Sequence, residues 1–188
     1  MPTPPDDELL RTAFRDVHAT RLYGFALLVA LGDRPLAAAA AGQALAAGTQ
    51  HIHELRHPER AAAWLRRRVL RSLRRGIARK RAHPTREALR PLGVDEPLLA
   101  CLSGLSIVER AALVASSVEH LAPADIETIL GAGPAATRRM VAAARARYLA
   151  AAAKGAGAAI GSGQLTEQVL MVAARGFAPS AARTGRSA

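Results

Sequence analysis

The chain has 188 residues, of which half are hydrophobic and only 3% are aromatic, and it carries a formal net charge of +11. This length holds one large domain or two small ones, and the prevalence of Ala, Leu and Arg without alternating β-branched runs predicts an all-α fold. One cysteine, Cys101, excludes an internal disulfide and a cysteine-built zinc site, and no apolar run is long enough to span a membrane.

The first two predicted helices are apolar. Residues 9–32 follow an acidic start and present one apolar helical face, made of Leu10, Phe14, Val17, Leu22, Phe25 and Leu28. A second helix, residues 35–53, begins with Pro35 and is almost entirely Ala, Leu and Gln. The opening MPTPPDDELL is not a secretion signal, so we expect a soluble cytoplasmic protein that does not bind membranes.

The third predicted helix, residues 64–80, concentrates the positive charge. Residues 64–90 hold eleven Lys and Arg against Glu87 alone, whereas residues 1–63 hold six Arg against seven acidic residues. One side of this helix carries an apolar stripe beside Trp64, which we expect in the core: Leu65, Val69, Leu73 and Ile77. The helix faces either phosphates or only solvent, and the arginines suited to phosphate are Arg66, Arg67, Arg71, Arg74 and Arg75.

A second set of helices is predicted after a proline-rich linker at residues 79–97. A short helix covers residues 98–105, and Ser106 with Glu109 forms a capping box that opens a helix running to about residue 120. A further helix starts at Ala122-Pro123 and breaks at residues 131–134. The next helix covers residues 135–152, which gives the layout of a helix-turn-helix.

The order of these segments from Leu9 to about Leu149 resembles an extracytoplasmic-function sigma factor, a small bacterial transcription initiation factor. The resembling motifs are Leu31-Gly32-Asp33, Ala63-Trp64-Leu65, Leu105-Ser-Ile-Val-Glu-Arg110, Asp125-Ile126 and Leu130-Gly131. The resemblance implies two small helical domains: a region 2-like bundle at residues 1–78 and a region 4-like helix-turn-helix at residues 98–153. The linker at 79–97 joins them, and a flexible tail with one possible short helix follows at 154–188.

The resemblance also implies partners and departures. Core RNA polymerase, promoter DNA and an anti-sigma factor would be the partners. The family's acidic stretch, which meets the polymerase, falls here on Ala38 and Ala39, followed by Gln43, so these are the implied polymerase-binding positions. The arginine common in the middle of the family's recognition helix is Met140 here. We therefore expect weakened polymerase binding or reduced promoter specificity.

The candidate DNA contacts lie on the two basic helices. Arg138 and Arg139 fall near the start of the recognition helix, where contacts to bases are usual. The whole predicted set is Ala136, Thr137, Arg138, Arg139 and Arg145 in the second module and Arg67, Arg71, Arg74 and Arg75 in the first.

Enzymatic and metal chemistry are not expected. No Ser/His/Asp arrangement, phosphate-cradling glycine loop or usefully spaced carboxylate pair occurs, so we predict a non-enzyme without a cofactor. His51, His53 and His57 lie close together, but no nearby ligand completes a tetrahedral set, and we interpret them as surface histidines.

Three functional hypotheses follow. The first is a sigma-type transcription initiation factor that binds core polymerase and a promoter. The second is a sigma-like DNA-binding regulator that no longer loads polymerase, and the third is a helical protein-interaction module that binds a partner such as an anti-sigma factor.

Overall fold

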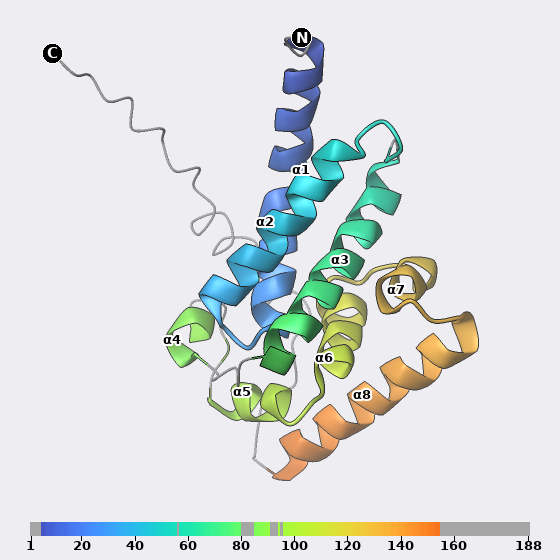
Figure 1. Cartoon of the computed structure of the whole chain (residues 1–188). Helices are drawn as coiled ribbons and strands as arrows, with labels where there is room; N and C mark the ends of the chain where they lie inside the picture. The colour runs from blue at the N-terminus through green and yellow to red at the C-terminus, as the bar shows by residue number, and fades with distance from the viewer. Residues whose placement is uncertain (1–4, 56, 80–84, 91–93, 95, 155–188) are drawn as a thin grey trace, which may run out of the picture.

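The structure is a bundle of helices of very unequal length. The computed structural model describes residues 5–55, 57–79, 85–90, 94 and 96–154, and these ranges contain helices and no strand, so the all-α prediction is confirmed. The elements, shown in Figure 1, are α1 (Pro5–Val29), α2 (Arg34–Gln50), α3 (Pro58–Arg79), α4 (Arg86–Leu89), α5 (Glu96–Ser103), α6 (Ile107–Leu113), the π-helix η2 (Val114–Val118), α7 (Pro123–Leu130) and α8 (Pro134–Lys154).

Small residues let the first three helices lie side by side. The buried side of α2 consists largely of alanines, namely Ala37, Ala40, Ala41, Ala44 and Ala47. A Cβ atom added to Gly48 would lie 2.8 Å from the Phe14 ring, so no larger residue fits where α2 meets α1. Leu31 and Gly32 turn the chain with positive φ angles of 54° and 82°, and the Asp33 carboxylate then accepts the main-chain N–H of Leu36 at 3.0 Å.

The third helix confirms the predicted apolar stripe as far as the structure describes its side chains. Leu65, Val69 and Leu73 are completely buried, whereas the side chain of Ile77 lies outside the described residues. The helix begins at Pro58, earlier than the predicted Trp64. Trp64 itself is only partly buried against the core, because the Arg68 guanidinium lies over its ring at 4.7 Å.

The predicted capping box is present, but the helix that it opens is not regular. The Ser106 hydroxyl accepts the main-chain N–H of Glu109 at 3.3 Å, and the Glu109 carboxylate accepts that of Ser106 at 2.9 Å. The expected helix to residue 120 ends instead at Leu113 and continues as the π-helix Val114–Val118. His120 then adopts a φ of 50°, a left-handed conformation that ends the segment.

The two predicted modules share one hydrophobic core. Buried residues from α1, α2 and α3 form a single cluster with those of α5, α6, α7 and α8, and α3 lies against α7. Three side chains within the predicted linker, Ala88, Leu89 and Val94, are buried in the same cluster. The main-chain N–H of Thr85 also donates to the Leu31 carbonyl at 3.0 Å. The segment between the modules is therefore packed rather than free, and the domain boundaries remain a prediction; the tail at 155–188 lies outside the described residues.

Candidate nucleic-acid interface

The predicted break between the helices of the helix-turn-helix is found at Gly131. This residue follows α7 with a φ of 66°, and its main-chain N–H donates to the Glu127 carbonyl at 2.8 Å. A left-handed residue at this position is energetically cheap only for glycine, so the sequence fixes where α7 ends. Pro134 then opens α8, which takes a different direction from α7 (Figure 1).

The first turns of α8 present two arginines to solvent. Arg138 and Arg139 are both exposed, as a contact with DNA requires, and Ala136 is half-buried. Thr137, which was predicted to contact DNA, is only 4% exposed, and its hydroxyl donates to the Ala132 carbonyl at 3.3 Å. The prediction for Thr137 is therefore wrong, because this side chain holds the turn in place from the inside.

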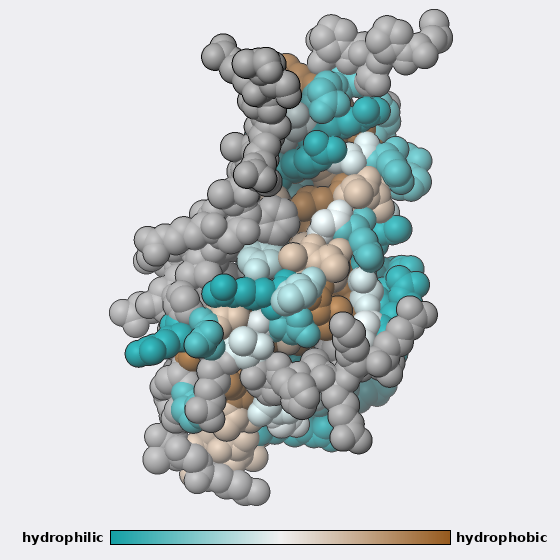
Figure 2. Space-filling view, turned by 60° about the vertical axis from the view of Figure 1, so that its left-hand side comes forward, coloured by the Kyte–Doolittle hydropathy of each residue, from teal (hydrophilic) through white to brown (hydrophobic). Residues whose placement is uncertain are grey.

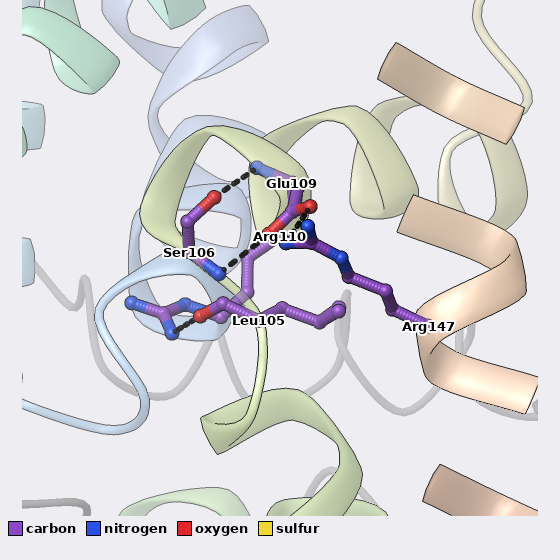
Figure 3. Close-up of polar contacts among 5 residues, drawn as sticks. All are labelled: Leu105, Ser106, Glu109, Arg110 and Arg147. Carbon is purple, nitrogen blue, oxygen red and sulfur yellow. Dashed lines mark hydrogen bonds and ion pairs between the residues drawn. The ribbon is translucent and has the colours of Figure 1, made fainter. Parts of the chain in front are cut away.

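Further along α8, two arginines contact neighbouring helices. The Nε of Arg145 donates to the Ser117 hydroxyl at 3.3 Å, although the side chain stays exposed. Nη1 of Arg147 lies 2.6 Å from the Glu109 carboxylate, as Figure 3 shows. Tyr148 is buried on the same helix. The exposed cations of α8 are thus divided between a free N-terminal pair and a C-terminal part that fixes the helix to α6 and η2.

Three of the predicted phosphate contacts on α3 are free. Arg71, Arg74 and Arg75 are exposed, and no carboxylate of the described chain forms an ion pair with them. Arg67 is half-buried, and its guanidinium lies 3.3 Å from the position that a Cβ atom on Gly131 would occupy. Arg67 therefore sits against the turn of the helix-turn-helix, near the carbonyl end of α7, where a cation is favoured.

Arg66 was predicted to contact phosphate, and this prediction is wrong. Its side chain is 4% exposed. Nε and Nη2 donate to the two carboxylate oxygens of Glu119 at 2.7 and 2.6 Å, Nη1 donates to the Ala62 carbonyl at 3.0 Å, and the guanidinium lies 5.8 Å from the centre of the Phe25 ring. All of its hydrogen-bonding directions are committed within the fold.

The implied polymerase-binding positions form an uncharged exposed face on α2. Ala38, Ala39 and Gln43 are all exposed, and the Gln43 side-chain oxygen accepts the Ser72 hydroxyl from α3 at 3.1 Å. Figure 2 shows one face of the molecule, on which hydrophilic residues alternate with apolar ones.

Arg110 lies in the core, which the sequence reading did not anticipate. Its Nε donates to the Val29 carbonyl at the end of α1 at 2.9 Å, and Nη1 donates to the Leu105 carbonyl at 2.6 Å (Figure 3) and to the Leu102 carbonyl at 3.4 Å. Burial lowers the pKa of Arg110 to about 10, so the group stays charged at neutral pH. A charged residue inside a helix-opening motif is a weak signal, since its partners are carbonyls that any residue carries.

The Glu109 carboxylate carries two jobs at one point. Burial raises its pKa, but the hydrogen bonds from Ser106 and the charge of Arg147 outweigh that effect, so the pKa of Glu109 is lower than its usual value. The carboxylate therefore caps α6 and receives α8 at the same time.

The three clustered histidines do not assemble into a metal site within the described ranges. Nδ1 of His51 lies 3.2 Å from the Glu54 carboxylate, and Nε2 of His53 lies 3.7 Å from that of Asp7. In the described part of the chain no group of three or more His, Cys, Asp and Glu side chains could hold a metal ion. None of the described helices combines the length and the apolar character that crossing a bilayer needs.

Comparison with known proteins adds no relative: no protein-family model, no curated protein and no solved structure matches this chain.

Proposed function

We propose that this chain is a sigma-type transcription initiation factor that binds core RNA polymerase and promoter DNA in the cytoplasm. The observation that carries the proposal is the exposed pair Arg138 and Arg139 at the start of α8, directly after the left-handed turn at Gly131. The N-terminal part of the second helix of a helix-turn-helix is where side chains reach base edges in the major groove. The exposed arginines of α3 supply further phosphate contacts: Arg71, Arg74 and Arg75.

The DNA-binding part of the proposal is tested with a paired substitution. Replacing Arg138 and Arg139 with Ala should weaken binding to a duplex and should lower the slope of log K against log salt by about 2, since each phosphate contact contributes about 0.9. The matched control replaces Arg15 and Arg34, two exposed arginines of α1 and α2, and changes the net charge equally. Equal losses in both variants would reduce the effect to net charge and contradict a specific surface.

The initiation part is tested with purified core RNA polymerase. The chain should co-elute with the core enzyme in gel filtration and should support run-off transcription from a cognate promoter. Failure of the full chain to bind the core enzyme under low salt would reject the initiation role.

A second candidate, a DNA-binding regulator that does not load polymerase, is favoured by the uncharged face of α2. Ala38 and Ala39 are exposed and offer no carboxylate to a basic polymerase surface. If this candidate is right, duplex binding persists without a polymerase complex. The double substitution Ala38→Glu and Ala39→Asp should then create or strengthen polymerase binding, whereas Ala38→Gln with Ala39→Asn, which adds similar bulk without charge, should not.

A further inference from the structure

The ion pair between Arg66 and Glu119 joins the two halves of the fold. Arg66 belongs to α3, and Glu119 follows the π-helix η2, 53 residues later. The pair is bidentate, with contacts of 2.6 and 2.7 Å, and the Arg66 and Glu119 side chains are only 5% and 14% exposed. A bidentate guanidinium–carboxylate pair that is shielded from water is strongly orienting, so it fixes the second half against α3.

The backbone around Glu119 is irregular, and the irregularity positions the carboxylate. The main-chain N–H of Glu119 donates to the Val114 carbonyl at 2.9 Å, five residues back, as in a π-helix. His120 follows in the left-handed region, and the N–H of Leu121 donates to the Ala115 carbonyl at 3.0 Å. Neither feature is favourable for these residue types, so both depend on contacts made by the neighbouring groups.

The surface that this ion pair closes is incompletely filled and partly polar. A hollow of about 260 Å³ lies beside Arg66 between α1, α3 and α7, and its lining includes Arg21, Ala62, Leu121 and Asp125. Interfaces between parts of one chain that are polar and poorly filled resemble transient protein interfaces, which separate more readily than a close-packed core.

We propose that the Arg66–Glu119 pair is a latch that keeps the helix-turn-helix closed against α3 and withholds Arg66 and Arg67 from nucleic-acid phosphates. In the closed form Arg66 donates only to groups of this chain, and Arg67 lies against Gly131. A phosphate backbone and the Glu119 carboxylate therefore compete for the same guanidinium, and binding DNA opens the latch. The inference rests on the proposed nucleic-acid function but needs no polymerase.

The latch is tested by removing the carboxylate charge. Glu119→Gln should speed hydrogen exchange of the α7 amides and should strengthen binding to a duplex of arbitrary sequence by about tenfold, because apparent affinity follows the fraction of molecules in the competent form. The matched control is Glu109→Gln, which makes the same charge change at an ion pair within the second half. It should alter neither measurement. A folded Glu119→Gln variant whose duplex affinity is unchanged or weaker overturns the proposal.

A locked variant decides the question if Glu119→Gln does not fold. Ala62→Cys and Asp125→Cys, in a Cys101→Ala background, place two thiols on the lining of the same hollow, where a short bismaleimide can join α3 to α7. The cross-linked chain should lose most of its duplex affinity relative to the same protein treated with a monofunctional maleimide. Equal affinity of the two forms would overturn the latch.

The two proposals fail in distinguishable ways. Hydrogen exchange reports opening in the absence of any ligand, and the arbitrary duplex reports phosphate binding alone. Loss of the polymerase complex with intact effects of Glu119→Gln and of the cross-link rejects only the initiation role. Normal initiation together with unchanged exchange rates and affinities in these variants rejects only the latch.

Discussion

Replacing Arg110 with Met weighs the buried hydrogen bonds of a cation against the cost of burying it. The two short bonds, at 2.9 Å to the Val29 carbonyl and 2.6 Å to the Leu105 carbonyl, would be lost. Hydrogen bonds from charged groups contribute about 1.5–3 kcal/mol each, so the loss is about 3–6 kcal/mol. The lowering of the Arg110 pKa to about 10 corresponds to a burial cost of about 3 kcal/mol, which Met would not incur. The bonds win, and we expect Arg110→Met to lower the free energy of unfolding by about 2 kcal/mol.

Urea unfolding followed by circular dichroism at neutral pH measures this difference. The control is Arg147→Met, which removes the ion pair with Glu109 from a side chain that is 67% exposed. It should cost at most about 1 kcal/mol, because water screens such a pair. An Arg110→Met protein as stable as the wild type would show that the burial cost cancels the hydrogen bonds, and the reasoning above would be refuted.

Three further effects on stability can be measured in the same assay. Gly32→Ala should cost about 2–3 kcal/mol, because the residue has a φ of 82° and its new Cβ atom would lie 2.5 Å from the Thr85 carbonyl oxygen, whereas Gly42→Ala, with nothing within 4 Å, should gain about 0.5–1 kcal/mol. Burial, aided by the charges of Arg66 and Arg21, lowers the pKa of His18, so the unfolded chain takes up this proton more readily. The free energy of unfolding should therefore fall as the pH drops below about 6.5, and His18→Gln should flatten that part of the profile; an unchanged slope in the variant would assign the effect to another group. Ser106→Ala should cost about 1 kcal/mol by removing one half of the capping box, and a cost near zero would mean that water replaces the hydroxyl.

The elements that depend on local sequence were predictable. The Leu65, Val69 and Leu73 stripe follows from helical periodicity alone, and those residues are buried. The capping box at Ser106 and the turn at Gly131 follow from side chains that satisfy their own neighbouring backbone. In each case the controlling interaction spans only a few residues, so the sequence contains all of the needed information.

The features that depend on distant partners were not predictable in this way. Helical phase places Arg66 beside other arginines, but only the fold brings Glu119 to it. Thr137 was assigned to DNA because it precedes Arg138, yet the approach of Ala132 turns its side chain inward. Arg110 has main-chain carbonyls from α1 and α5 as partners, and carbonyls leave no trace in the sequence pattern.

The number of residues in η2 determines where the Glu119 carboxylate points. A π-helical turn contains one residue more than the corresponding α-helical turn, and each residue of an α-helix rotates the side chain by about 100°. Deleting a single residue between Val114 and Val118 would thus let α6 continue as an ordinary helix while swinging the acid away from α3. The attachment between the two halves is encoded in segment length as well as in side-chain chemistry, so a variant with every charge intact could still separate.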